Sequence, residues 1–197
     1  MFKHLRVRRV ITGEPKDRSS EFTHLEEVTP LVNGLARIYS VWGFDSTPTL
    51  PFCSREPYVD DSMFPPKGGI RVQVIVFPPP PVDGAAERRG QPVGVENTSG
   101  NQELRRRLRV QGFERLKGPD VIPGMHRTDT IDIGVVISGK MSVTCTDRSE
   151  VILDVGDVYI QNGAMHAWRG LDQEHDNAVA FVIVGAERLE ADGGSQE

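Results

Sequence analysis

Residues 124–168 decide the fold, and they read GMHRTDTIDIGVVISGKMSVTCTDRSEVILDVGDVYIQNGAMHAW. Short segments rich in β-branched residues alternate here with turn-forming pairs such as Ser138-Gly139, Gly156-Asp157 and Asn162-Gly163. That pattern predicts a meander of short antiparallel strands. Two isolated histidines, His126 and His166, stand near the two ends of the stretch.

The rest of the chain adds further strands and no helix–strand alternation. Alternating or apolar runs predict strands at residues 5–11, 36–44, 69–77 and 177–186. A chain with this many short strands buries them and hides their edges by closing into a barrel or a jelly roll. The sequence therefore predicts an all-β fold.

One domain is expected over residues 1–197, in three parts. N-terminal strands and loops occupy residues 1–68, the barrel occupies 69–186, and a flexible tail follows at 187–197. The barrel carries a long irregular insertion at 82–118, which is basic and punctuated by glycine. A lid, an oligomer contact and a mobile loop all remain open as roles for this insertion.

Composition excludes several classes of function. A net charge of -5 speaks against nucleic acid as a partner. The N-terminus lacks a signal-peptide core and no apolar run is long enough to cross a bilayer, so a cytoplasmic protein without membrane contact is expected. Cys53 and Cys145 are far apart in sequence, and Cys145 is predicted to be a small buried group and not half of a disulfide.

His126 precedes a predicted strand, and polar side chains share one face from this histidine into the strand. Counting by twos from His126 passes through Thr128 and Thr130 to Asp132. A face of His, Thr, Thr and Asp is too polar for ordinary core. If this face points inward, it lines a cavity.

Closure of a barrel would bring His166 toward these residues, with Gln161 close to it. Two imidazoles and one carboxylate, from His126, Asp132 and His166, form a facial set suited to Fe(II), Mn(II) or Zn(II). The alternative is that each histidine is a hydrogen-bonded structural residue. Trp168 shares the face of His166 and either packs the cavity wall or stacks on a substrate.

The same residues resemble the two motifs of the cupin superfamily, over about 45 residues. Matching positions are His126 for the first histidine, Asp132 for the glutamate, Gly139 for the closing glycine, Gly156 for the glycine that opens the second motif, and His166 for its histidine. The departures are Thr128 at the second histidine position, a missing proline in the second motif, and Gly170 at its terminal asparagine position. They leave a three-ligand metal site or none.

The segment is similar to a narrower group of single-domain cupins from bacteria and from fungal secondary-metabolite pathways, some described as oxidoreductases. This resemblance implies a double-stranded β-helix, which is a jelly-roll barrel. Cupins catalyse several reaction types, so the fold alone does not choose among them.

Three functions follow as expectations. The first is a metal-dependent oxidoreductase of secondary metabolism that acts on an oxygenated aromatic or polyketide-like molecule, with His126, Asp132 and His166 as metal ligands and catalytic residues, and Thr128, Gln161 and Trp168 touching the substrate. The second is a metal-independent lyase or isomerase, such as a dehydratase or decarboxylase, that uses histidine acid/base chemistry. The third is a small-molecule binder without catalysis. The basic-apolar strand at residues 5–11 offers an edge for pairing, so a homodimer is expected.

Overall fold

The computed structural model describes residues 5–14, 19–33, 36–50, 62–77 and 113–189. Every helix or strand in these ranges is a β-strand, which confirms the all-β prediction. The predictions made for Cys53, for the insertion before residue 113 and for the tail beyond residue 189 fall outside the described residues.

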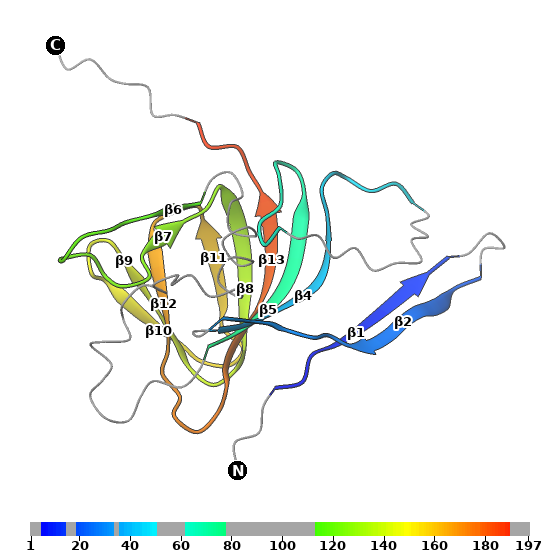
Figure 1. Cartoon of the computed structure of the whole chain (residues 1–197), viewed down its shortest axis with the longest axis horizontal. Helices are drawn as coiled ribbons and strands as arrows, with labels where there is room; N and C mark the ends of the chain where they lie inside the picture. Colours follow the sequence, from blue (N-terminus) through cyan, green and yellow to red (C-terminus); the bar gives the residue numbers. More distant parts are fainter. Residues whose placement is uncertain (1–4, 15–18, 34–35, 51–61, 78–112, 190–197) are drawn as a thin grey trace.

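Two antiparallel sheets and one ribbon make up the architecture (Figure 1). The ribbon pairs β1 (Arg8–Gly13) with β2 (Glu21–Glu27). The first sheet, called sheet C, has the order β10 (Glu150–Leu153), β9 (Met141–Cys145), β12 (His166–Gly170), β7 (His126–Arg127) and β6 (Glu114–Arg115). The second, called sheet B, has the order β11 (Val158–Asn162), β8 (Thr130–Ser138), β13 (Asn177–Gly185), β5 (Ile70–Phe77), β4 (Ala36–Phe44) and β3 (Leu31–Asn33).

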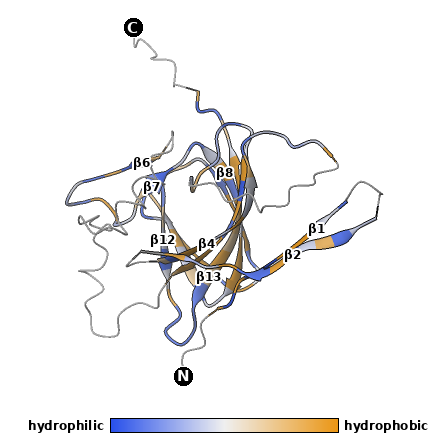
Figure 2. Cartoon of the chain, turned by 45° about the vertical axis from the view of Figure 1, so that its right-hand side comes forward, coloured by the Kyte–Doolittle hydropathy of each residue, from blue (hydrophilic) through white to orange (hydrophobic). Residues whose placement is uncertain are grey.

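The chain switches between the two sheets at nearly every turn, and this produces the jelly roll. It runs from β8 in sheet B to β9 and β10 in sheet C, back to β11, then to β12 and finally to β13. Tight turns permit these switches: Gly139 and Gly163 adopt φ angles of 69° and 64°, which favour glycine. The strands curve around a common interior, as Figure 2 shows.

The main core lies between the two sheets and comes from the strands of the meander and from β13. Its buried members are Val136, Met141, Val143, Leu153, Val179, Phe181 and Ile183. Each such side chain stabilises the fold by about 1.5–3 kcal/mol relative to an exposed one. This apolar cluster holds sheets B and C together.

The first four residues of strand β8 turn their polar side chains inward and their apolar side chains outward. Thr130 and Asp132 are buried, whereas Ile131 and Ile133 are 42% and 41% exposed. An ordinary half-buried strand has the opposite arrangement. The inward polar face confirms that this part of the interior is not ordinary core.

The N-terminal ribbon projects from the barrel (Figure 1). The predicted edge strand is present as β1, but β2 pairs with it along its length. Strand β2 escaped prediction because Glu21–Glu27 is largely polar and exposed on both faces. Val7 and Val28, which flank the ribbon, pack against Val74 of β5 and anchor the ribbon to sheet B.

A groove of about 620 Å³ lies where β1 passes β4. Val10, Trp42 and Phe44 contribute to its walls. It contains neither His126 nor His166, so Trp42 belongs to this groove and not to the predicted site. We place the candidate site at the histidines, because the described residues that line the groove include no acid/base pair.

Two predictions require correction. Cys145 is exposed and not buried, because it is the last residue of β9 and opens the turn in which its N–H donates to the Ser149 carbonyl at 2.9 Å. The end of the predicted insertion is regular, since Glu114 and Arg115 form β6 at the edge of sheet C.

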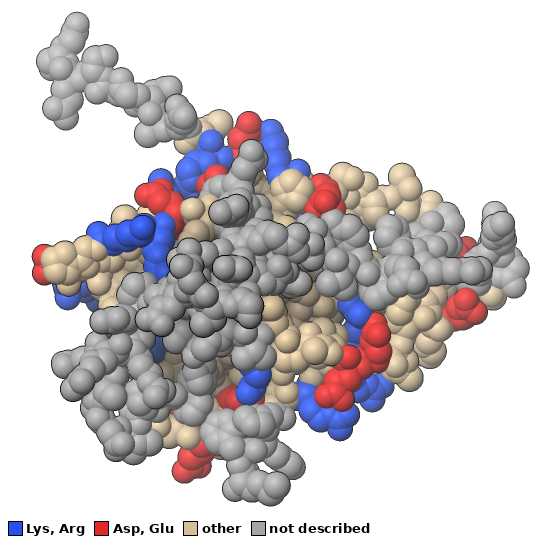
Figure 3. Space-filling model, in the orientation of Figure 1, with Lys and Arg blue, Asp and Glu red and all other residues tan. Residues whose placement is uncertain are grey.

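The face of the molecule shown in Figure 3 has no large patch of a single charge among its described residues. Acidic and basic side chains are interspersed on the face shown in Figure 3. The described part of the chain contains no helix with the length and apolar character needed to span a membrane.

The loop between β12 and β13 depends on one buried amide, and this gives a stability prediction. The side-chain Oδ1 of Asn177 accepts hydrogen bonds from the backbone N–H groups of Lys140, Leu171 and Asp172 at 3.1, 3.2 and 2.8 Å. Asn177→Ala should lower the free energy of unfolding by about 3 kcal/mol or more, because several buried donors lose their partner at once. Urea unfolding measures this loss, with the exposed Asn162→Ala as the control. A loss in Asn177→Ala no larger than in the control would contradict the prediction.

Candidate functional site

Two histidines and an arginine lie in one row across sheet C. The backbone register pairs Arg115 of β6 with His126 of β7, and His126 with His166 of β12. The next residue in the row is Cys145 of β9, paired with His166. Residues directly opposite each other in antiparallel strands point to the same face. The row therefore brings side chains from distant parts of the chain together.

The two imidazole rings are in close contact. Their centroids are 4.5 Å apart with an interplanar angle of 46°. His166 is buried and His126 is partly buried. The convergence of the two histidines, expected from barrel closure, is present.

Asp132 lies on a different sheet from this pair, because the chain changes sheets before reaching it. His126 belongs to β7 in sheet C, whereas Asp132 belongs to β8 in sheet B. The alternation counted from His126 to Asp132 thus crosses from one strand to another, with Thr128 in the connection. Thr128 and Thr130 are buried, and their hydroxyl oxygens lie 2.6 Å apart.

The Asp132 carboxyl is buried without a full set of partners. Its Oδ1 atom makes no hydrogen bond to any described residue. Burial raises its pKa from 3.8 to about 6, and a hydrogen bond from Thr130 opposes the rise only in part. Asp132 is opposite Gln161 in the register of β8 and β11.

Gln161 connects the His166 ring to Tyr159. The Tyr159 hydroxyl donates to Gln161 Oε1 at 2.8 Å. The Gln161 amide nitrogen contacts both the Ala164 carbonyl and His166 Nδ1. A carbonyl only accepts, so the amide end that faces Ala164 is the NH₂ group, and its second hydrogen points at His166 Nδ1.

The two histidines consequently carry their protons on different ring nitrogens. His126 Nδ1 lies 2.8 Å from the Gly124 carbonyl and donates to it, which leaves Nε2 with a free lone pair. His166 Nδ1 also lies 3.0 Å from the Ala164 carbonyl. Two donors cannot face each other, however, so the Gln161 contact favours an accepting Nδ1 and a protonated Nε2 on His166.

Both imidazoles are neutral near pH 7. Burial is the largest cause that lowers the pKa of His126, and the charge of Arg115 lowers it further. Burial, together with the neighbouring His126, lowers the pKa of His166 to about 4. Neutral imidazoles can act as bases, hydrogen-bond donors or metal ligands.

Aromatic rings surround the pair on both sides. Phe113 stacks on His126 at a centroid distance of 5.4 Å, and Phe64 stacks on Phe113 at 6.0 Å. Trp168 meets His166 edge to face at 6.3 Å and also contacts Phe181 of the core. Trp168 lies on the same face as His166, as predicted, and its ring packs between His166 and the core residue Phe181.

The predicted metal set is only partly assembled. In the described ranges, no three His, Cys, Asp or Glu side chains are grouped so that they could hold a metal ion. His126 and His166 are together, but Asp132 lies on the other sheet. A metal would also need a lone pair on His166 Nε2, which is the nitrogen that the Gln161 contact favours as protonated. The residues as placed therefore do not fit a three-ligand centre.

Several residues of the site escaped sequence reasoning. Arg115 and Phe113 fell inside the predicted irregular insertion, where no strand pattern revealed that they reach His126. Tyr159 shares the alternation of Gln161 within the run DVYIQ, and this parity could have identified it.

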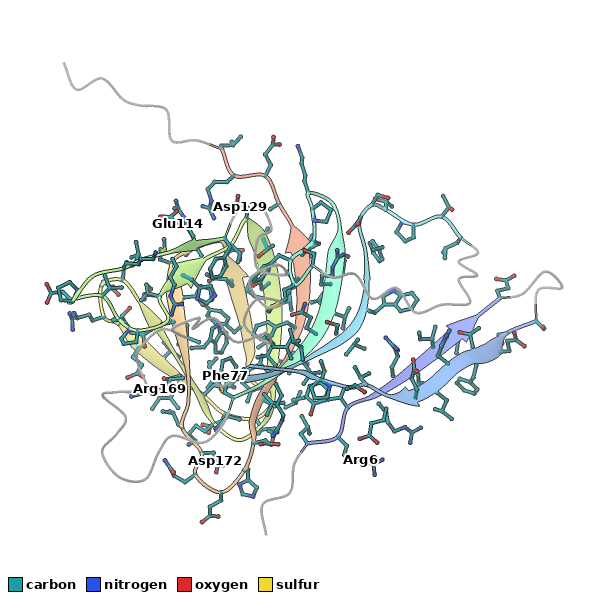
Figure 4. All side chains as sticks on the ribbon, in the orientation of Figure 1. Arg6, Phe77, Glu114, Asp129, Arg169 and Asp172 are labelled. Carbon is teal, nitrogen blue, oxygen red and sulfur yellow. The ribbon has the colours of Figure 1, made fainter. Side chains whose placement is uncertain are left out.

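Figure 4 shows the end of the barrel near which β6 and β7 lie, marked by Glu114 and Asp129, with Asp172 toward the opposite end.

Replacement of Gln161 tests the assignment of the proton on His166. In Gln161→Leu, Nδ1 loses its amide donor, so the ring should move its proton to Nδ1 and donate to the Ala164 carbonyl. ¹⁵N NMR of the imidazoles distinguishes the two neutral tautomers directly. The exposed Gln173→Leu is the matched control. A wild-type His166 that already carries its proton on Nδ1 would refute the assignment.

Asp132 and His166 predict opposite dependences of stability on pH. The folded-state pKa of Asp132 is raised, so its contribution is full below about pH 4 and is lost as the pH rises through about 6. The pKa of His166 is depressed, so its contribution is present above pH 6.5 and is lost as the pH falls toward 4. Asp132→Asn removes the first dependence and leaves the second.

The free energy of unfolding of Asp132→Asn should therefore rise more steeply between pH 4 and 6 than that of the wild type. The difference should not exceed about 3 kcal/mol, since one pKa unit corresponds to about 1.4 kcal/mol. Urea unfolding at several pH values measures both curves. The exposed Asp120→Asn is the control, and an equal change of slope in that variant would rule out the assignment.

Comparison with known proteins gives partial sequence matches. No protein-family model matches the chain. It is 36% identical over 90 residues to phomopsin biosynthesis cluster protein C' of Diaporthe leptostromiformis, covering 44% of this chain and 48% of that protein. It is 33% identical over 78 residues to the cupin-domain-containing oxidoreductase srdB of Neurospora crassa, covering 38% of this chain and 40% of that protein. The chain spans about half the length of the curated relatives it matches.

Among solved structures, the cupin domain of Schizosaccharomyces pombe Cnp3 aligns over 93% of this chain and 89% of that chain, with 10% identity and a TM-score of 0.40. The two sheets are joined as a jelly roll, and relatives that match the sequence are named as cupin-domain proteins. The chain is therefore similar, over part of its length, to proteins named as cupin-domain proteins.

Proposed function

We propose that the protein is a small-molecule tailoring enzyme of secondary metabolism, and that its histidine pair transfers protons. One observation carries the proposal: the two imidazoles lie 4.5 Å apart, and their hydrogen-bond contacts favour protons on different ring nitrogens. His126 Nε2 is a base and His166 Nε2–H is an acid in the same resting state. The relatives' origin in biosynthesis clusters supports the tailoring role.

The pair suits an isomerisation or a dehydration. His126 Nε2 takes a proton from a carbon next to a carbonyl, and the carbon–hydrogen electron pair moves toward that carbonyl. His166 Nε2–H gives its proton to the carbonyl oxygen, or to a hydroxyl that departs as water. The total charge is unchanged, because His126 becomes an imidazolium and His166 an imidazolate, and transfer of a proton from His126 back to His166 restores both neutral rings. Each positioned group contributes roughly 10²–10⁴-fold in rate.

Surroundings of the pair favour an oxygenated aromatic substrate. Phe113 and Trp168 present rings on the two sides of the histidines, and such rings stack on aromatic ligands. Gln73 of β5 is buried opposite Phe181, whose ring contacts Trp168, and it offers an acceptor: its amide nitrogen donates to the Met63 carbonyl at 2.8 Å, while its Oε1 has no partner among the described residues. A phenolic or enolic hydroxyl matches such an acceptor.

A metal-dependent oxidoreductase is the second candidate. Relatives named as oxidoreductases favour it, as does the partnerless Oδ1 of Asp132, an acceptor that would otherwise be costly to bury. His126, Asp132 and His166 would hold the ion, after Gln161 released His166 Nδ1. The ion would activate the substrate as a Lewis acid or carry the redox change.

Proton exchange into an aryl 1,3-diketone in D₂O tests the first candidate against the second. His126→Gln and His166→Gln should each lower the exchange rate at the central carbon by 10²-fold or more. Chelator-treated wild type should keep its rate, and the exposed His175→Gln is the control.

Elemental analysis of protein purified without chelator accompanies the assay. Loss of exchange on chelation, restored by Fe(II), Mn(II) or Zn(II), would replace the acid/base proposal with the metal-dependent one. Wild-type rates in both histidine variants would exclude the pair from catalysis.

A further inference from the structure

We infer that Arg115 binds a carboxylate group of the ligand, so that the site takes an aromatic carboxylate. This inference deepens the proposed function, on which it rests for the location of the reacting atoms. The ring of the ligand would lie by Phe113 and its carboxylate by the guanidinium of Arg115.

Register places Arg115 beside the histidines. Arg115 is directly opposite His126 on the neighbouring strand, with both side chains on the inner face of sheet C. Such partners have Cβ atoms about 4.5–5.5 Å apart. Phe113 precedes β6, and its ring stacks on the His126 ring at a centroid distance of 5.4 Å.

The guanidinium of Arg115 lacks a counterion within the described part of the chain, where no hydrogen bond or ion pair engages it. The adjacent carboxylate, Glu114, is directed to the opposite face, where its Oε2 accepts from Arg127 Nε at 2.8 Å. Arg115 is partly buried, and this burial lowers its pKa because the charge is desolvated. Desolvation without a partner is a cost that an anionic ligand would offset.

Buried arginines elsewhere in the fold show what Arg115 lacks. Arg9 donates to the Glu26 carboxylate and to the Val41 carbonyl, and Arg71 donates to Asp45 at 2.6 Å. Each has a carboxylate that matches the planar fork of its guanidinium. At Arg115 no such carboxylate is found among the described residues.

The neighbouring rings define the remainder of the ligand. Phe64, Phe113 and His126 stack in sequence at 6.0 and 5.4 Å, with interplanar angles of 25° and 30°. An aryl ring beside this stack gains contact area with little loss of conformational freedom. Carboxylate and ring together specify a benzoate-like group.

Benzoate is therefore the probe, and benzamide is its neutral counterpart of the same shape. Binding is followed through the His126 imidazole signals in NMR and by calorimetry, without any turnover. Wild-type protein should bind benzoate at least 10-fold more tightly than benzamide. Arg115→Gln should remove that preference and Arg115→Lys should restore it in part, since lysine keeps the charge but not the fork.

Arg127→Gln is the matched control, because it lies on the same strand pair but on the opposite face. It should bind benzoate as the wild type does. Equal affinity of wild type and Arg115→Gln for benzoate would overturn the inference. Inorganic phosphate that displaces benzoate with equal or greater affinity would overturn the carboxylate assignment. Failure of the proton-transfer proposal would leave benzoate binding unchanged, so the two ideas fail separately.

Discussion

The pairing of β12 with β7 is the constraint on which the site depends. It sets His166 directly against His126, although 39 intervening residues form four strands of the meander. Those strands, together with β13, build the apolar core that keeps sheets B and C together. The pairing of β12 with β7 therefore requires the turns and the core to form as well, and a change in the register of one strand would disturb all three.

The barrel buries two kinds of side chain, with different effects. The core around Met141 and Phe181 supplies the free energy of folding, while the row around His126 keeps polar groups away from water. Desolvation acts on both histidines and on Asp132, and it favours the uncharged form of each. A pair of neutral imidazoles at pH 7 is the result, and it is the state in which one nitrogen can accept while another donates.

The sequence predicted the strands that alternate or carry β-branched residues, the inward polar face and the approach of Gln161 to His166. It did not reveal β2, because Glu21–Glu27 is exposed on both sides and shows no burial period. The change of sheet after His126 was also hidden, since Thr128 continues the alternation across a break in hydrogen bonding. Arg115 could not be found at all, because register between distant strands is a tertiary property that no local pattern encodes.

The row of Arg115, His126, His166 and Cys145 also affects how such a barrel can diverge. Each position comes from a different strand, so one side chain can be exchanged without moving the other three. An inserted or deleted residue in β7 would instead turn its whole face to solvent. Substitutions can therefore convert one chemistry into another on an unchanged frame, whereas changes of length abolish the site. Proteins with this fold can therefore change their reaction by substitution, provided that the number of residues in each strand stays the same.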